Sequence, residues 1–398
     1  MCRMRVLISG AGVAGPTLAF WLLRNGFTPV LVESAPRLRT GGYVIDFWGA
    51  GFEIANRMGL LPHIRPFGYI VNEIRVVNDA GAPVVSLPAE VFSSATQGRF
   101  ISIPRGDLAA AIYASLDGKV ETLFGDRIAG IDSSSGDGVT VSFEHHQTRR
   151  FDLIIGADGL HSGVRRLVFG EESRFERYLG LKAAAFAAPG YAPRDPLVYV
   201  MYTQVGRQVF RFSLNDGATM FLLTFRDPDP AIPPTLAAQK ALLRSRFAGA
   251  GWECPRILDA LDLCSDLYFD RVSQIHMGSA PGAWSRGRVA LLGDAAFCVS
   301  LLAGQGTALA MVAAYILATE LAHANGDFSR AFARYRQRFG PFVLGKQKAA
   351  TRMAGFFAPR SPLSLFLRDR VLGMMSHPWI TRLAVGRSLI DRIDLSDS

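Results

Sequence analysis

The chain has 398 residues, with 43 Lys and Arg against 34 Asp and Glu, which gives a formal net charge of +9. Hydrophobic residues make up 49% of the sequence and charged residues only 19%, so the composition excludes a disordered chain and predicts a large buried core in two or three domains. The four cysteines are scattered without a Cys-x-x-Cys pair, so we expect neither a disulfide framework nor a metal site.

The positive charge does not by itself indicate a nucleic-acid partner. Only five of the 43 basic residues are lysines, and the arginines are spread along the chain instead of forming a basic block or helix face. We therefore expect a solvated basic surface that mildly attracts anionic cofactors, and no nucleic acid.

Two long uncharged stretches, 6–23 and 295–319, superficially resemble a signal peptide and a membrane span. Closely spaced glycines interrupt both, three in the first and two in the second. Neither a signal peptide nor a bilayer span needs this pattern. We interpret both stretches as buried strand, turn and helix units of a cytoplasmic protein without stable membrane insertion.

The first stretch predicts a nucleotide-binding turn. Arg5 to Ser9 form a short apolar strand, and a glycine run leads from it into a helix with Pro16 in its first turn. The first glycine of such a run permits a tight turn, the second lets the backbone approach a pyrophosphate, and the third lets the helix pack on the strand. The residues expected around the pyrophosphate are Gly10, Gly12, Val13, Ala14 and Gly15.

Glu33 follows a second predicted strand, 29–32, and lies 18 residues after Gly15. A carboxylate at the end of this strand accepts both hydrogens of a ribose diol. The succession of strand, turn, helix, strand and acid predicts a dinucleotide site but leaves open whether the dinucleotide is NAD or FAD.

Two later segments are typical of ligand-binding strand ends. The strand 151–156 leads into an Asp-Gly pair at Asp158, which either delivers a carboxylate to a ligand or forms a simple turn. Another strand ends at Asp294, and Gly304 and Gly306 then open a long apolar helix. The N-terminus of that helix suits negative charge, such as the charge that develops on a reduced flavin.

In this order the motifs resemble the single-component, FAD-dependent aromatic hydroxylases of the para-hydroxybenzoate hydroxylase fold, over essentially the whole chain. The segment 41–46, Gly-Gly-Tyr-Val-Ile-Asp, is similar to the branch that contains the tetracycline-inactivating monooxygenases. The residues that carry the family resemblance are Gly10 to Gly15 with Glu33, Arg105, Asp158, Asp294, Gly304 and Gly306.

The resemblance implies roles for several of these residues. FAD would place its pyrophosphate on the glycine run and its adenosine ribose on Glu33. Arg105 would contact the ribityl and phosphate region, and Asp294 would hold the ribityl chain. The Asp158 motif is linked in this family to both FAD and the nicotinamide donor, NADPH or NADH. No catalytic acid or base is singled out, because the cofactor carries the chemistry.

The chain departs from the family in its last motif. The family usually has His after Gly-Asp-Ala-Ala and Pro in the loop before the glycines, whereas this chain has Phe297 and no Pro in 300–302. FAD binding should survive because Asp294 and the glycines remain. We expect the departures to alter the loop beside the isoalloxazine and the placement of the substrate.

The resemblance implies an α/β fold with a Rossmann-like FAD-binding domain of the GR2 type, an inserted β-sheet substrate domain and a C-terminal helix. The expected ranges are 1–70, 98–175 and 283–335 for the discontinuous FAD-binding domain, 71–97 and 176–282 for the substrate-binding domain, and 336–398 for the C-terminal helical segment.

Strand patterns in the expected substrate domain alternate between two faces. Val209 and Arg211 would point to one face, and Phe210 and Phe212 to the other. The resemblance places such a sheet over the flavin, where an aromatic face would hold a ring-containing molecule; the same aromatics could equally be sheet core, so no substrate residue is assigned. The tail after Gly340 carries aromatic residues among Arg and Lys. The resemblance implies that it includes a helix that braces the two domains; the alternative is an amphipathic membrane-binding segment.

The resemblance implies a monooxygenase that uses NAD(P)H and O₂. NAD(P)H would reduce FAD, O₂ would form a flavin C4a-hydroperoxide, and one oxygen atom would pass to an aromatic or polycyclic, enolic small molecule. Two alternatives stay open: a FAD-dependent dehydrogenase or reductase of an isoprenoid or polycyclic substrate, and a flavoprotein that binds a hydrophobic ligand as a sensor or carrier. The oligomeric state, monomer or homodimer, is also open.

Overall fold

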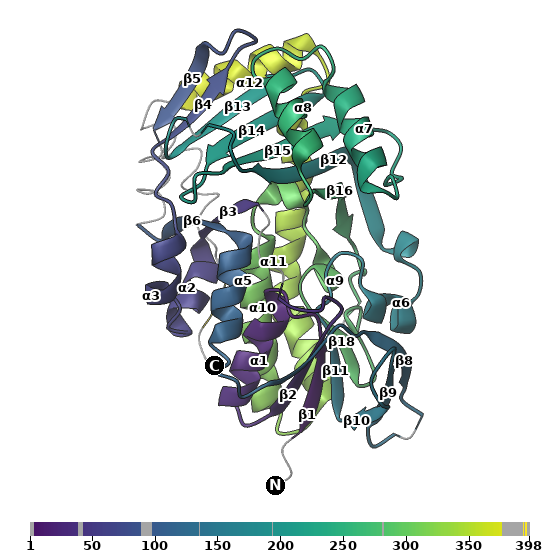
Figure 1. Ribbon diagram of the computed structural model, residues 1–398. Helices are drawn as coiled ribbons and strands as arrows, with labels where there is room; N and C mark the ends of the chain where they lie inside the picture. The colour runs from purple at the N-terminus through teal and green to yellow at the C-terminus, as the bar shows by residue number, and fades with distance from the viewer. Residues whose placement is uncertain are drawn as a thin grey trace.

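The computed structural model describes residues 4–38, 43–88, 98–134, 136–192, 194–280 and 282–375, together with residues 393 and 395. A lower part built on a six-stranded sheet and an upper part built on a seven-stranded sheet are stacked along the long axis of the molecule (Figure 1). Gly41 and Gly42, from the segment similar to the tetracycline-inactivating branch, lie outside the described residues.

The six-stranded sheet has the order β17-β18-β11-β1-β2-β7, and all its pairings are parallel except the one at the β17 edge. Its central strands are short apolar runs that are almost fully buried, as expected of parallel strands covered by helices. Because parallel strands end at the same edge, the loops after β1, β11 and β18 meet there. The strands are β1 (Arg5–Ser9), β2 (Thr28–Glu33), β7 (Glu121–Phe124), β11 (Leu153–Gly156), β17 (Ser285–Arg286) and β18 (Val289–Leu291).

Helix α10 (Gly306–His323) is the core helix of the lower part. Among the described helices it is the one long and apolar enough to cross a membrane, but 72% of its apolar window is buried inside the molecule. Helices α1 (Ala14–Arg24), α2 (Gly49–Arg57) and α11 (Phe328–Phe357) pack around it. The apolar composition of α10 is therefore explained by this packing.

The seven-stranded sheet has the order β16-β12-β15-β14-β13-β4-β5, and its pairings are antiparallel except for β13 with β4. Helices α7 (Leu236–Phe247) and α8 (Cys254–Leu263) cover its outer face (Figure 1). The strands are β4 (Glu73–Val77), β5 (Pro83–Pro88), β12 (Glu176–Ala188), β13 (Val198–Gln204), β14 (Arg207–Ser213), β15 (Thr219–Arg226) and β16 (Tyr268–Ile275).

The predicted alternation along β14 is confirmed. Val209 belongs to the apolar cluster beneath α7 and α8, and Arg211 forms an ion pair with Glu253 at the start of α8. Phe210 points the other way and contacts the ring of Phe357 on α11, with ring centroids 6.2 Å apart. The aromatic face of the strand thus faces the lower part and α11.

Helix α11 is the bracing element predicted near the C-terminus. It packs against α10 in the lower part. It also contacts β14 in the upper part, where the Phe357 ring packs on the Phe210 ring. The helix starts at Phe328 and continues without interruption past residues 335 and 336, where the sequence suggested a segment boundary.

Smaller elements complete the described chain. Strands β3 (Val44–Trp48) and β6 (Phe100–Pro104) form a two-stranded sheet, and β8 (Ile128–Asp132), β9 (Val139–Phe143) and β10 (Arg149–Phe151) form a three-stranded sheet. The remaining helices are α3 (Leu61–Ile64), η1 (Arg65–Phe67), α5 (Arg105–Ala114), α6 (Gly163–Phe169), η2 (Glu172–Arg174), α9 (Asp294–Phe297), η3 (Leu301–Ala303) and α12 (Pro362–Met375).

Candidate functional site

Gly10 and Gly15 form a turn that leaves no room for side chains. Gly10 has a φ of +107°, and a Cβ on it would lie 2.5 Å from the backbone oxygen of Ala157. A Cβ on Gly15 would lie 1.9 Å from the backbone oxygen of Gly10. Neither obstacle is a movable side chain, so both positions require glycine. Helix α1 begins at Ala14, and its first N–H groups and the positive end of its dipole lie at this turn.

Gly12 differs from its neighbours because the space beside it is open. The nearest atom to a Cβ at this position is a guanidinium nitrogen of Arg105, 4.0 Å away. Arg105 begins α5, and its backbone N–H donates to the oxygen of Tyr43 at 3.1 Å. Open backbone next to a guanidinium is the combination that suits a phosphate group.

Glu33 at the end of β2 stabilises the glycine turn directly. Its Oε2 accepts the Ala11 N–H at 2.8 Å, and its Oε1 accepts the Ala35 N–H at 2.9 Å. A carboxylate has about four acceptor positions, so capacity remains for the hydroxyl groups of a ribose.

Asp294 is the first residue of α9, shortly after β18, and its carboxylate lies beside the N-terminus of α10. A Cβ on Gly306 would lie 3.6 Å from its Oδ1 and 4.0 Å from its Oδ2. Gly293 has a φ of +66°, and a Cβ there would lie 3.2 Å from the Cβ of Ala14. The first and last predicted cofactor motifs, nearly 300 residues apart in the sequence, are thus in contact at one sheet edge.

Tyr43 and Arg105 share the electrostatic environment of Asp294. Burial raises the pKa of the Asp294 carboxyl, and the opposing effects of Arg105 and of a hydrogen bond with Cys298 are smaller. Burial also raises the pKa of Tyr43 to about 12, again against the effect of Arg105. A buried carboxyl of this kind suits a hydroxyl partner such as a sugar-alcohol chain better than it suits an anion.

Asp158 lies beside the glycine turn but bonds within its own loop. Its Cα would be 3.0 Å from a Cβ on Gly10. Its carboxylate accepts the Ser162 hydroxyl at 2.5 Å and the Val164 N–H at 3.1 Å, which holds the start of α6. The simple-turn interpretation accounts for these bonds, and a role toward FAD or the nicotinamide donor stays a prediction.

Gly304 adopts the left-handed conformation that ends η3, with a φ of +62°. A Cβ on it would lie 3.9 Å from the Trp48 ring of β3. Ser300 lies in the loop in which the family usually carries Pro. It also has a positive φ, +116°, which is strained for a residue other than glycine. Its Oγ accepts the Leu302 N–H at 3.2 Å and so supports the loop.

The side chain of Phe297 is part of the core behind this loop. It is 2% exposed, and its ring centroid lies 5.0 Å from that of Trp284 and 5.2 Å from that of Phe339. The substitution of the family's usual His therefore extends an aromatic cluster rather than adding a side chain at the loop surface.

Two buried glutamines that hold the loop after Asp294 were missed by the sequence analysis. Gln274 of β16 donates to the oxygen of Val299 at 3.0 Å, and Gln347 of α11 donates to the oxygen of Cys298 at 3.2 Å. One sequence signal could have indicated that Gln347 is buried. It lies four residues after Val343, and therefore on the same apolar face of α11.

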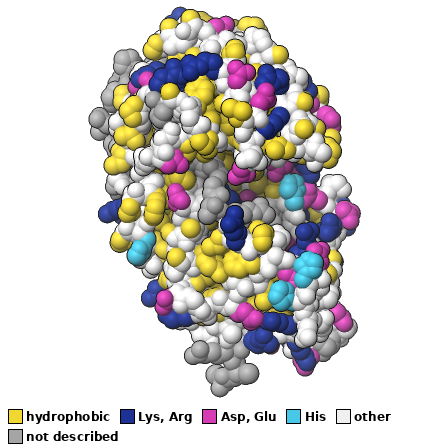
Figure 2. All heavy atoms as spheres, in the orientation of Figure 1, with side chains coloured by type: hydrophobic (Ala, Val, Ile, Leu, Met, Phe, Trp, Pro, Cys, Tyr) yellow, Lys and Arg dark blue, Asp and Glu magenta, His cyan; other side chains and the backbone are white. Residues whose placement is uncertain are grey.

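An aromatic floor of the upper sheet faces the site. The Phe212 ring lies 4.6 Å from Tyr199 and 5.1 Å from Tyr69, measured between centroids. Tyr199 also donates to Asp46 of β3 at 3.2 Å, so the floor is joined to the lower part by a polar contact. Tyr43 connects the floor to the Asp294 site, since it packs against the same apolar cluster. Figure 2 shows a hollow between the lower and upper parts, with a Lys or Arg side chain at its mouth.

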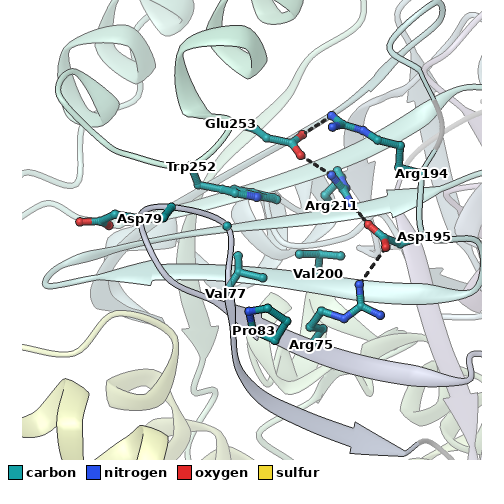
Figure 3. Close-up of a pocket in the computed structure, with 12 residues that line it drawn as sticks. Arg75, Val77, Asp79, Pro83, Arg194, Asp195, Val200, Arg211, Trp252 and Glu253 are labelled. Atoms are coloured by element: carbon teal, nitrogen blue, oxygen red, sulfur yellow. Dashed lines mark hydrogen bonds and ion pairs between the residues drawn. The ribbon is translucent and has the colours of Figure 1, made fainter.

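A separate cavity of about 460 Å³ opens on the outer face of the upper sheet, away from this floor (Figure 3). Alternating ion pairs cross it from β4 to α8, so its charges are neutralised within the protein. Trp252 lies along one side, with the Arg211 guanidinium 5.5 Å from its ring centroid. The residues in this series of ion pairs are, in order, Arg75, Asp195, Arg211, Glu253 and Arg194.

Sequence comparison finds relatives that span nearly the whole chain, although no protein-family model matches it. A flavin-dependent monooxygenase of Legionella longbeachae is 34% identical over 375 residues, which cover 91% of this chain and 92% of the relative. An uncharacterized protein of Mycobacterium tuberculosis is 39% identical over 347 residues, which cover 86% of this chain and 91% of the relative.

Solved structures give the same result. Tetracycline destructase Tet(55) is 30% identical, with a TM-score of 0.83 and coverage of 99% of this chain and 98% of that one. Klebsiella pneumoniae HpxO, complexed with FAD and uric acid, is 22% identical, with a TM-score of 0.78. The match covers 97% of this chain and 95% of that one, and at this identity it is evidence for the fold alone. The chain therefore belongs to the FAD-dependent monooxygenases of the para-hydroxybenzoate hydroxylase fold, in the branch that contains the tetracycline-inactivating enzymes.

Proposed function

We propose that the enzyme hydroxylates an aromatic or polycyclic, enolic small molecule, with NAD(P)H as electron donor and O₂ as oxygen source. The observation that carries this proposal is the position of the aromatic floor around Phe212, which shares an apolar cluster with Tyr43 of the Asp294 site. Ring side chains at such a position suit a flat, ring-containing substrate. The name of the neighbour Tet(55), a tetracycline destructase, supports a polycyclic enolic substrate class.

The residues at the sheet edge fit FAD. The glycine turn excludes side chains, the space beside Gly12 is open next to Arg105, and the carboxylate of Asp294 lies beside the start of α10. When bound there, FAD would take electrons from NAD(P)H and activate O₂ for the transfer of one oxygen atom to the substrate. We propose that the residues that hold it are Gly10, Gly12, Val13, Ala14, Gly15, Glu33, Arg105, Asp158, Asp294, Gly304 and Gly306.

In this proposal the chain contributes orientation, charge stabilisation and exclusion of water. The N-terminus of α10 and the guanidinium of Arg105 stabilise negative charge that develops beside Gly306. Tyr43 and Tyr268, whose ring centroids are 5.6 Å apart, help to exclude water from the space above Asp294. The segments 1–70, 98–175 and 283–335 act as the FAD-binding domain, and 71–97 with 176–282 as the substrate-binding domain.

We propose that the enzyme is cytoplasmic and is a monomer or homodimer. Cys254 and Cys298 are buried free thiols, which suits a reducing compartment, and a nicotinamide donor is available there.

The test is product analysis under ¹⁸O₂. The FAD-loaded protein is incubated with NADPH and a panel of phenols and tetracyclines, and the products are analysed by mass spectrometry. We expect one ¹⁸O atom in the product of at least one ring substrate. Oxidised or reduced product without ¹⁸O would indicate the dehydrogenase or reductase instead. Consumption of NADPH that yields only hydrogen peroxide across the panel would refute hydroxylation of these substrate classes.

A further inference from the structure

A second cavity, of about 440 Å³, lies where the strands β12 and β15 meet the end of α11 and the turn into α12. Four arginines from four separate segments line it: Arg177, Arg226, Arg352 and Arg360. Among the residues that the structure describes, no Asp or Glu lines the cavity. It is large enough for a small molecule with several polar groups.

The four arginines lack the ion pairs that neutralise the cavity on the outer face. Within the part of the chain that the structure describes, none of them forms a salt bridge with a carboxylate. Arg226 uses its Nε to donate to the oxygen of Ala358 at 2.7 Å, which leaves its terminal nitrogens available. Asp227 follows Arg226 in sequence, but its carboxylate is engaged by Lys182 and Arg246, each at 3.1 Å.

Neighbouring ionisable groups respond to this concentration of positive charge. Burial lowers the pKa of Arg226, and the guanidinium of Arg360 lowers it further. Burial also lowers the pKa of His276, and Arg177 adds to the effect. Like charges held this close are unfavourable without a counter-ion, so the cavity is suited to an anion.

The cavity adjoins the loop that leads to the flavin site. Two of its lining residues, Leu179 and Ala354, belong to an apolar cluster that also contains Leu301 and Leu302 of η3. Gly304 directly follows η3, and α10 begins two residues later at Gly306. A ligand in the cavity would therefore lie behind the loop that borders the proposed cofactor.

We propose that this cavity binds a phosphate-bearing small molecule through Arg177, Arg226, Arg352 and Arg360. Guanidinium groups match phosphate oxygens in paired hydrogen bonds, and an array of four suits a diphosphate or two separate phosphate groups. Two sources supply this chemistry: the nicotinamide donor, and a free phosphorylated metabolite. Only the first source rests on the proposed function.

Calorimetry with inorganic pyrophosphate tests the site itself. The FAD-loaded protein is used so that the flavin cradle is filled, and the variant carries Arg352→Ser with Arg360→Ser, both at exposed positions. The matched control carries Arg24→Ser with Arg256→Ser, two exposed arginines on other helices. We expect saturable binding to the wild type, at least about tenfold weaker binding to the variant, and unchanged binding to the control. Absence of saturable binding, or equal affinity in all three proteins, would overturn the proposal.

Steady-state kinetics then identifies the source of the phosphate. A rise of about tenfold in the KM for NADPH in the Arg352→Ser, Arg360→Ser variant, with the control unchanged, assigns the site to the donor. If the KM for NADH rises less than the KM for NADPH, the arginines contact the 2′-phosphate that only NADPH carries. Unchanged KM values together with lost pyrophosphate binding assign it to a free phosphorylated molecule. Because calorimetry needs no turnover, its result stands even when no hydroxylation is found.

Discussion

Gln274 on β16 and Gln347 on α11 are joined by a buried hydrogen bond: Gln274 Nε2 donates to the backbone oxygen of Gln347 at 2.9 Å. Gln347 Nε2 in turn donates to the backbone oxygen of Ile275 at 2.8 Å. The same two side chains reach the oxygens of Val299 and Cys298 in the loop after Asp294. One amide pair thus links the upper sheet, the bracing helix and the loop at the proposed flavin site.

We expect Gln347→Leu to destabilise the protein and weaken FAD binding. The leucine keeps the volume but removes the donor to the oxygen of Ile275, at about 1–3 kcal/mol for a buried group left unpaired. The oxygen of Cys298 also loses this donor but still accepts the Ile275 N–H at 3.0 Å. Urea unfolding measures the free energy of unfolding, and flavin fluorescence measures FAD release. The control is Gln239→Leu, because Gln239 is a partly buried glutamine whose Nε2 donates to the oxygen of Pro233, just before α7, at 3.0 Å. Equal stability and FAD affinity in the two variants would contradict the assigned role.

Gly15→Ala should reduce FAD affinity by more than about tenfold. The added Cβ would lie 1.9 Å from the backbone oxygen of Gly10, so the turn must distort, and overpacking of this kind costs about 1–3 kcal/mol. The control is Gly345→Ala, an exposed α11 position with no atom within 4 Å of the added Cβ. Alanine there should be neutral or stabilising by up to about 1 kcal/mol. Fluorescence titration of the apoprotein with FAD compares both variants, and equal FAD affinity would refute the steric argument.

The N-terminal unit could be predicted closely because its signals are local. The strand Arg5–Ser9 agrees with the expected range, and Gly10 and Gly15 occupy positions where backbone contacts forbid a Cβ. The alternation of β14 was predictable for the same reason, since Phe210 and Arg211 must point to opposite faces.

The rest depends on contacts between distant segments. Gln274 and Gln347 are 73 residues apart, and nothing in either local sequence indicates the other. The four-arginine cavity likewise assembles from β12, β15, α11 and the turn that follows. A spread of arginines along the sequence looks like a solvated surface until the fold brings four of them together.

Phe297→His tests the interpretation of the departure from the family motif. A histidine at this position would replace a ring packed on Trp284 and Phe339 with a polar side chain that is almost fully buried, at a cost of about 1–3 kcal/mol. The control Phe297→Leu stays apolar and should cost less than about 1.5 kcal/mol. Thermal unfolding at neutral pH measures both variants. A Phe297→His protein as stable as the wild type would show that the ring is not needed in the core.

His161 links the Asp158 loop to the upper sheet. Its Nδ1 lies 2.9 Å from Glu172 Oε1, and its Nε2 lies 3.1 Å from Asp270 Oδ2 on β16. Hydrogen bonds with Asp270 and Glu172 raise the pKa of His161 from its usual 6.5 to about 10. The protonated form is therefore favoured in the folded state.

This shift predicts how stability changes at alkaline pH. Because the folded-state pKa lies above the unfolded value, the contribution of His161 is complete below pH 6.5, falls as the pH rises, and is lost above about 10. The side chain is 51% exposed, so solvent screening makes the effect modest. Urea unfolding of the wild type and of His161→Gln should give a constant difference in free energy below pH 6.5 that shrinks toward pH 10. A difference that stays constant from pH 6 to pH 10.5 would contradict a charged His161 as the contact between the two parts.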